Sequence, residues 1–294
     1  ENASAVASMA AQGVVTGGFE LSKYKTVDKN TKQIDNFVLI AEDGANENDL
    51  AEGLKRGEMI GESINFTRDL CNEPPNILTP TEMANRAQKM AEEVGLKCEI
   101  LDEDQMEKLG MGSLMSVSRG SAQPAKMIVL RYDPAAETST AKEAELLAFV
   151  GKGITFDTGG ISLKPGEGME AMKYDMSGGG AVIGTMRAIG LLKSTIPVLG
   201  VVAAVENMPG GQATRPSDVV TAMNGKTIEI LNTDAEGRLI LADAVAYAEK
   251  QGATRIVDMA TLTGAVIIAL GEHNTGVLGN DQELIDQIIE CGKE

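Results

Sequence analysis

Short apolar segments alternate along this chain with longer segments of helical periodicity. The run at 197–205 is nearly continuous in apolar residues, as expected for a strand that is covered on both faces. Similar runs predict further strands at 97–101, 126–132, 145–150, 227–231 and 255–259. Helices are predicted at 178–192, 237–250 and 282–289. This alternation predicts an α/β fold whose helices lie on both faces of a central sheet.

The first part of the chain predicts a smaller, separate piece. Residues 1–13 have helical character, and the apolar run at 37–40 predicts a strand. The cluster at 46–49 is typical of a helix N-cap and opens a long helix, which the two prolines at 74–75 end. Cap chemistry at 79–82 starts another helix, which ends at Gly95. We therefore expect a small N-terminal piece at 1–46, a connecting helix at 47–75 and the main domain at 76–294.

The excess of acidic over basic residues argues against two classes of binding partner, nucleic acids and anionic membranes. The 294 residues include 43 acidic and 26 basic side chains, which give a net charge of −17. Such a chain lacks the basic surface that binds nucleic acid, and an anionic membrane would repel it, so neither partner is expected. The sequence has no visible signal peptide and no apolar run that approaches a membrane span, and Cys71, Cys98 and Cys291 form no paired motif. A cytoplasmic location is therefore expected.

His273 is the only histidine of the chain, and this restricts the chemistry. A His-x-x-x-His metal helix cannot be built, and a Ser-His-Asp triad could use this residue alone. Any metal site must therefore rely on carboxylates, carbonyls, water and lysine.

Three segments carry clustered charges. They are a glycine-rich segment at 150–164 that follows an apolar strand, a segment at 172–176 before a predicted helix, and the octapeptide at 232–239. The charged residues, in chain order, are Lys152, Asp157, Lys164, Asp175, Asp234, Glu236 and Arg238. Each segment alone has a simpler explanation. The lysines could be exposed on a turn, the acids could complement helix dipoles, and the arginine could be a salt-bridge partner.

Taken together, the acids favour a metal site. Asp157, Asp175, Asp234 and Glu236 all lie in loops after apolar strands or at the helix starts beyond them, and such positions converge at one edge of a parallel sheet. Four carboxylates in one place cannot all stay ionised without compensation. Two divalent cations would neutralise them, so the sequence predicts a two-metal site.

With these motifs the chain resembles the leucyl (cytosol) aminopeptidase family of two-metal exopeptidases. The resemblance covers nearly the whole chain and includes the segments 151–164, 172–176, 206–209, 232–239 and 260–265. It implies a three-layer α/β/α catalytic domain at 76–294 with a mixed, mostly parallel central sheet, preceded at 1–46 by a remnant of a small N-terminal α/β domain. It also implies a metal-dependent aminopeptidase that releases leucine-like N-terminal residues from peptides and serves intracellular peptide turnover.

The resemblance implies two sets of metal ligands. Lys152, Asp157, Asp175 and Glu236 would bind one readily exchanged ion, with the lysine as a neutral amine. Asp157, Asp234 and Glu236 would bind a tighter ion. A water that bridges the two ions would attack the scissile carbonyl.

Other roles follow from the same resemblance. Lys164 would polarise the carbonyl and stabilise the oxyanion, and Arg238 would hold a bicarbonate-like anion that acts as general base. The pocket for the first side chain of the substrate would be lined by Met172, Thr261, Leu262 and Gly264.

Several expectations concern the whole protein. Members of this family are substantially longer, so we expect this chain to begin inside the small N-terminal domain and to stop before the end of the catalytic domain. A homohexamer is implied for the full-length protein. The metal ions could be manganese, zinc, magnesium or cobalt. Two alternatives stay open, a two-metal phosphoesterase and a catalytically inactive binding or scaffold relative.

Overall fold

The computed structural model describes residues 3–27, 34–40, 46–134 and 145–293. The chain divides into two compact units, Glu1–Thr261 and Leu262–Glu294. The second unit contains two helices, α8 (Ala265–Leu270) and α9 (Gln282–Cys291), and the second of these matches the helix predicted at 282–289. No helix among the described residues is long and apolar enough to cross a membrane.

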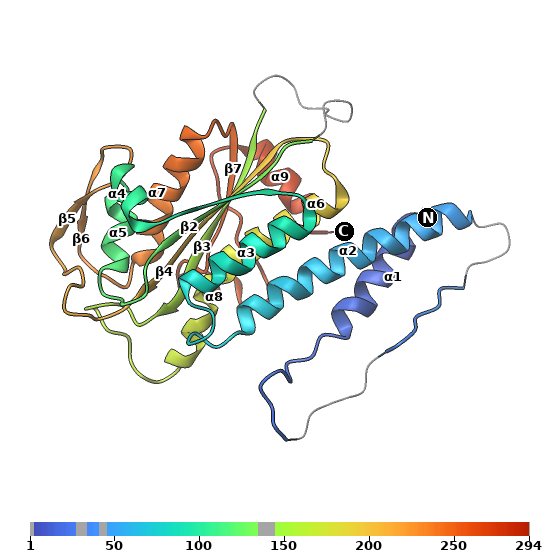
Figure 1. The fold of residues 1–294 in the computed structure, drawn as a ribbon, viewed down its shortest axis with the longest axis horizontal. Helices are drawn as coiled ribbons and strands as arrows, with labels where there is room; N and C mark the ends of the chain where they lie inside the picture. Colours follow the sequence, from blue (N-terminus) through green and yellow to red (C-terminus); the bar gives the residue numbers. More distant parts are fainter. Residues whose placement is uncertain (1–2, 28–33, 41–45, 135–144, 294) are drawn as a thin grey trace. The chain divides into compact units, whose positions relative to one another are not determined.

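A five-stranded sheet forms the centre of the first unit (Figure 1). Its strands lie in the order β1 (Lys97–Leu101), β2 (Lys126–Tyr132), β4 (Val198–Asn207), β3 (Leu147–Asp157) and β7 (Arg255–Met259). Strand β2 pairs antiparallel with both its neighbours, whereas β4, β3 and β7 pair parallel. Four strands therefore share one direction, and the predicted mixed, mostly parallel sheet is confirmed.

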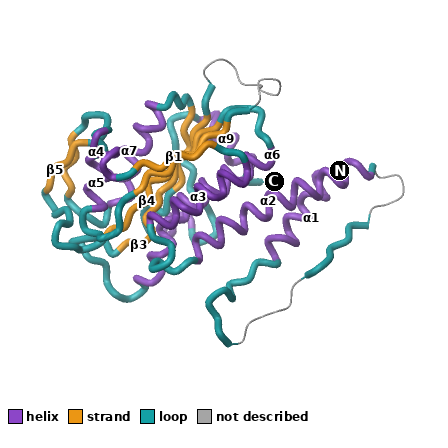
Figure 2. Tube along the Cα trace, viewed as in Figure 1, coloured by secondary structure: helices purple, strands orange, loops and turns teal. Residues whose placement is uncertain are grey.

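Helices cover both faces of this sheet, as Figure 2 shows for the first unit. One face packs against α2 (Glu47–Asn72), α3 (Pro80–Val94) and α6 (Ser177–Leu192). The other packs against α4 (Glu103–Lys108), α5 (Gly112–Ser118) and α7 (Glu236–Lys250). Successive residues of β2 enter opposite cores, because side chains alternate across a strand. The predicted α/β fold with a helix layer on each face is confirmed.

The predicted helix boundaries follow from local chemistry. The side chain of Asn46 accepts a hydrogen bond from Asn48 N at the start of α2. The side chain of Thr79 accepts one from Glu82 N at the start of α3, and Gly95 ends that helix with a φ of 76°. These contacts satisfy amide groups that have no partner inside the helix, and a positive φ at a helix end is easiest for glycine.

Helix α1 (Ala3–Gly17) packs closely along α2 because α2 presents three glycines to it. A Cβ atom at Gly53 would lie 2.2 Å from Ser4 O, and one at Gly57 would lie 2.1 Å from Ser8 O. A Cβ atom at Gly61 would meet the side chain of Val15 at 2.8 Å. The helix backbones can approach this closely only where α2 has no side chain.

The strand predicted at 37–40 is wrong. The described residues 34–40 form no helix or strand, and Val38 and Ile40 are 76% and 89% exposed. A strand needs a neighbour to pair its backbone groups, and none of the described strands lies beside this segment. An apolar run alone therefore does not produce a strand.

Two further expectations about strands need correction. The strand predicted at 145–150 instead continues through the start of the glycine-rich segment as far as Asp157, as β3. A Cβ atom at Gly151 would lie 2.6 Å from Gly179 Cα, so this glycine permits close packing of α6 on the strand rather than a turn. The strand predicted at 227–231 is β6 (Thr227–Ile230), but it pairs only with β5 (Asp218–Thr221) in a separate antiparallel sheet.

Two glycines at the start of α6 should differ in how much an alanine substitution destabilises the fold. A Cβ atom at Gly178 would lie 2.0 Å from the backbone oxygen of Met259, whereas at Gly180 the nearest atoms are the side-chain ends of Cys71 and Met176 at 3.2 and 3.3 Å. We expect Gly178→Ala to lower the free energy of unfolding by about 2 kcal/mol, because backbone cannot yield as a side chain can. Gly180→Ala should change it by less than about 1 kcal/mol, because better helix propensity offsets a tight contact.

Urea unfolding of the two variants would measure this difference. Equal transition midpoints for Gly178→Ala and Gly180→Ala would contradict the close approach of α6 to β7.

Candidate metal centre

The carboxyl ends of β3 and β4 form the base of the site. Asp157 and Asn207 are the last residue pair of these parallel strands, and Asn207 Nδ2 donates a hydrogen bond of 2.8 Å to Asp157 Oδ1. The amide of Gly159 donates to the same oxygen at 2.9 Å. These two donors orient the buried carboxylate and leave Oδ2 for other partners.

A β-bulge in β3 brings two chemically important side chains to the same face. Lys152 and Asp157 are separated by five positions, and a regular strand would direct them to opposite faces. The register on β4 advances by one residue where β3 advances from Ile154 to Phe156, so β3 contains one extra residue. The bulge therefore restores a common direction, and both side chains reach the beginning of α7.

The beginning of α7 supplies two more acids. Asp234 lies in the turn before the helix and Glu236 is its first residue. One carboxylate oxygen of each, together with one of Asp157, lie within 4.8 Å of one another, which is close enough for all three to bind a single metal ion. The predicted meeting of these three acids is thus observed, although Asp234 and Glu236 follow the separate β5–β6 hairpin rather than a strand of the main sheet.

Lys152 is almost completely buried and lies between two acids. Its Nζ is 2.7 Å from Asp175 Oδ1 and 2.8 Å from Glu236 Oε1, and it donates to Thr261 O at 2.9 Å. Burial works to lower the pKa of Lys152, but the two carboxylates outweigh it and hold the pKa above its ordinary value. Without a metal ion, the lysine is thus the cation that compensates these acids.

Lys164 is the compensating cation for the other two acids, Asp157 and Asp234. Its Nζ lies 2.9 Å from Asp157 Oδ2 and also contacts Asp234 Oδ1. Burial works to lower the pKa of Lys164, but hydrogen bonds to Asp234 and Asp157 raise it overall. The side chain is half-buried, so its charge remains accessible from solvent.

Asp175 lies in the short 3₁₀ helix η1 (Met169–Met176), and burial raises its pKa to about 7 despite the opposing effect of Lys152. Burial also raises the pKa of Glu236, and although Lys152 opposes this, the charge of Asp157 adds to it. These directions indicate that the acids lack sufficient positive charge.

Two oxygen atoms identify where further charge would bind. Asp175 Oδ2 and Glu236 Oε2 are buried and have no hydrogen-bond partner among the described residues. A buried carboxylate oxygen without a partner is costly, and four carboxylates face only two ammonium groups in this cluster. Oxygen-rich, negatively charged surroundings of this kind suit divalent cations, so the residues fit a metal centre.

The remaining predicted residues take different positions. Arg238 is exposed on the first turn of α7, and the described residues provide no ion pair for it. Met172 is half-buried in η1, and Thr261 donates from Oγ1 to Asp175 Oδ1 at 2.7 Å. Leu262 and Gly264 belong to the second unit and are exposed there.

Three supporting residues were missed by sequence reasoning. Asn207 also donates to Thr233 O at 3.0 Å, and Thr233 Oγ1 donates to Gly159 O and accepts from Ser162 N. A Cβ atom at Gly237 would lie 2.9 Å from Lys152 Cε, so that glycine makes room for the buried lysine. A polar amide at the very end of a buried apolar strand is the signal that could have identified Asn207.

Comparison with known proteins identifies relatives of this chain. The sequence model of the family described as "Cytosol aminopeptidase family, catalytic domain" matches residues 65–294. A probable cytosol aminopeptidase of Solibacter usitatus is 55% identical over 288 residues, which cover 98% of this chain and 58% of that protein. A probable cytosol aminopeptidase of Koribacter versatilis is 51% identical over 97% of this chain and 54% of that protein. One of Alkaliphilus metalliredigens is 47% identical over 99% of this chain and 58% of that protein. The chain thus spans little more than half the length of these relatives, and over that length it belongs to the cytosol aminopeptidase family.

Proposed function

We propose that this chain carries the metal centre of a metal-dependent aminopeptidase that removes N-terminal residues from peptides. The observation that carries this proposal is the convergence of Lys152 and three other acids around Glu236, together with two buried carboxylate oxygens that have no partner among the described residues. Family membership supports the same reaction class.

Two groups of residues would hold the metal ions. Asp157, Asp234 and Glu236 are close enough to share one ion. A second ion would use the Lys152, Asp157, Asp175 and Glu236 group, with Asp157 and Glu236 common to both, and Lys152 would then bind as a neutral amine. When bound, divalent cations supply Lewis acidity and lower the pKa of water.

The side chains around these ligands would perform the rest of the chemistry. The half-buried Lys164 ammonium, already aligned by Asp157 and Asp234, would stabilise negative charge that develops on the carbonyl oxygen of the peptide. Arg238, exposed at the positive end of the α7 dipole, would hold a small bicarbonate-like anion that accepts the proton from the attacking water.

The preferred substrate would carry a leucine-like first residue. Met172 lies three residues before Asp175 in η1, and Thr261 donates a hydrogen bond to the Asp175 carboxylate, so both would line the pocket for this first residue. Burial of one additional methylene favours a substrate by only about 1–3 kcal/mol, so the expected preference is modest. The ion that Lys152, Asp157, Asp175 and Glu236 would hold would supply a site for the free α-amine of the substrate, which would restrict cleavage to the first peptide bond.

A side-by-side assay tests the function. With Mn²⁺ added, we expect the chain to hydrolyse leucyl-anilide and not a phosphodiester, because clustered carboxylates alone permit either reaction and family membership favours the aminopeptidase. Turnover of the phosphodiester alone would favour the phosphoesterase alternative. Calorimetry without specific binding of Mn²⁺ or Zn²⁺ would favour the inactive scaffold alternative.

Further properties of the whole protein stay predictions. Elemental analysis of protein purified without chelator would identify the metal, for which the ligands favour manganese and the affinity order favours zinc. Light scattering would test the homohexamer. A cytoplasmic location remains expected. The acidic composition argues against nucleic-acid binding, and a gel shift at low salt would test this.

A further inference from the structure

We propose that Asn72, the last residue of α2, is a positioning residue for Asp175. This inference rests on the proposed function, because its effect is exerted on one of the two proposed metal sites. Asn72 lies outside all the charged motifs and touches none of the proposed metal ligands directly. It acts on the 3₁₀ helix η1, which carries Asp175 at its penultimate position.

Asn72 holds η1 by two contacts with adjacent residues. Lys173 Nζ donates a hydrogen bond of 3.1 Å to the backbone oxygen of Asn72, and Tyr174 OH donates one of 3.3 Å to its side-chain Oδ1. Lys173 Nζ also lies 4.9 Å from the centre of the Tyr174 ring, so the two side chains form one unit. Both residues immediately precede Asp175, and a displacement of either moves its backbone.

The orientation of the Asn72 side chain is fixed from its own helix. Asn72 Nδ2 donates to Arg68 O at 2.7 Å, which leaves Oδ1 directed to Tyr174. A short 3₁₀ helix has poor intrinsic stability, so η1 depends on such outside contacts. Asp175 Oδ1 itself is held by Lys152 and Thr261. The α2 contact therefore supports η1 from an element that contains none of the proposed metal ligands.

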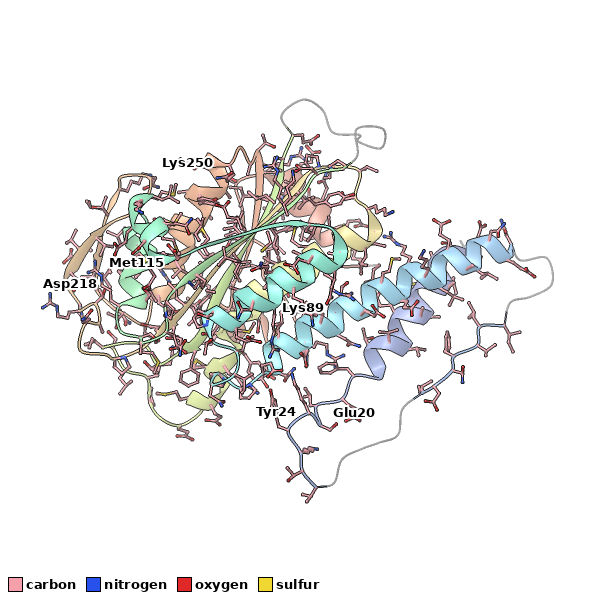
Figure 3. The ribbon with its side chains drawn as sticks, viewed as in Figure 1. Glu20, Tyr24, Lys89, Met115, Asp218 and Lys250 are labelled. Atoms are coloured by element: carbon pink, nitrogen blue, oxygen red, sulfur yellow. The ribbon has the colours of Figure 1, made fainter. Side chains whose placement is uncertain are left out.

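The end of α2 is itself anchored by the following residue. Glu73 is buried and accepts hydrogen bonds from Lys23 and Tyr24, and its Oε1 lies 3.1 Å from Arg86 Nη1. Burial works to raise the pKa of Glu73, but these partners outweigh it and lower the pKa overall. Tyr24, labelled in Figure 3, belongs to the segment after α1, and Arg86 belongs to α3, so both this segment and α3 secure the point from which Asn72 contacts η1.

Calorimetric titration with Mn²⁺ tests the proposal. We expect two classes of site in the parent chain. Asn72→Ala should weaken the exchangeable class about tenfold and leave the tight class unchanged, because indirect support of a ligand is worth about this much. Tyr174→Phe, which removes only an exposed hydroxyl, should weaken the same class about threefold. Asn72→Asp keeps an acceptor for Tyr174, so this variant should bind Mn²⁺ at the exchangeable class of site with an affinity close to that of the parent chain.

Asn48→Ala is the matched control, since Asn48 is exposed in the first turn of the same helix. The activity of Asn72→Ala on leucyl-anilide should recover when Mn²⁺ is raised in excess, whereas an altered fold would not be rescued in this way. If the parent binds two classes of Mn²⁺ and both Asn72→Ala and Tyr174→Phe bind them unchanged, the positioning role is refuted and the proposed function stands. If the parent binds no Mn²⁺, the proposed function itself fails.

Discussion

Asp234→Asn is expected to lower metal-dependent hydrolysis of leucine amide substrates by about 10³-fold or more, since it removes one of the three clustered acids that we propose as ligands of the tight metal ion. The substitution preserves the shape of the side chain but takes away its charge. The Asp234 side chain is 32% exposed, so the fold should tolerate the change. Mn²⁺ calorimetry should show that the tight class of site is lost while the exchangeable class remains.

The control is Asp218→Asn, which makes the same substitution on the β5–β6 hairpin (Figure 3). Asp218 pairs there with the exposed Arg215 and belongs to no metal ligand set. The activity and Mn²⁺ binding of the Asp218→Asn variant should equal those of the parent chain. Full activity of Asp234→Asn would exclude the proposed metal centre, because Asp157 and Glu236 cannot complete the tight site without it.

Lys152→Met is expected to destabilise the metal-free chain by about 3–5 kcal/mol near pH 8, because it leaves two acids buried without their cation. The two acids are Asp175 and Glu236, each within 2.8 Å of Lys152 Nζ. Methionine fills most of the volume of the lysine stem, so the loss reports charge rather than a cavity. Urea unfolding in the presence of chelator would measure it.

The loss should depend on pH in a defined direction. Burial already raises the pKa of Asp175 to about 7 and raises that of Glu236, and removal of Lys152 takes away the main opposing charge. Between the unfolded pKa, about 4, and the raised folded pKa, the folded state binds more protons than the unfolded state, so stability falls as pH rises. The difference between Lys152→Met and the parent should therefore be small near pH 5 and largest near pH 8.

Lys89→Met provides the control, because Lys89 is exposed on α3 (Figure 3). It should unfold like the parent at every pH. A Lys152→Met variant as stable as the parent near pH 8 would show that Asp175 and Glu236 do not depend on the lysine for their charge compensation.

Much of the fold could be predicted because local chemistry is strong in this chain. Asn46, Thr79 and Gly95 mark helix ends by side-chain caps or a positive φ, and these signals do not depend on tertiary contacts. Strand β4 is apolar and buried from Val198 to Val205, so its place in the centre of a sheet followed from its composition. The segment at 37–40 has similar composition but no neighbouring strand, and its conformation could not be predicted from composition.

The members of the metal centre could also be named from the sequence, although the reason for their meeting was only partly right. Asp234 and Glu236 were expected at the end of a strand of the main sheet, but β6 pairs outside it with β5. They reach the site because α7 packs across the sheet with its first residue beside Lys152. Thr233 and Gly237 could not be identified, since each acts through a neighbour in space, whereas Asn207 could have been identified as a polar amide at the end of a buried apolar strand.

The sequence by itself determined which charged groups this protein can bring together, because the residue types and the strand–helix alternation leave few other uses for them. Only the tertiary structure decided toward which face of the sheet each of these side chains points. The extra residue in β3 turns Asp157 to the face of Lys152, and five positions of regular strand would have separated them. The end of α2 then holds η1 through Asn72, a contact between residues about 100 positions apart that no local pattern encodes.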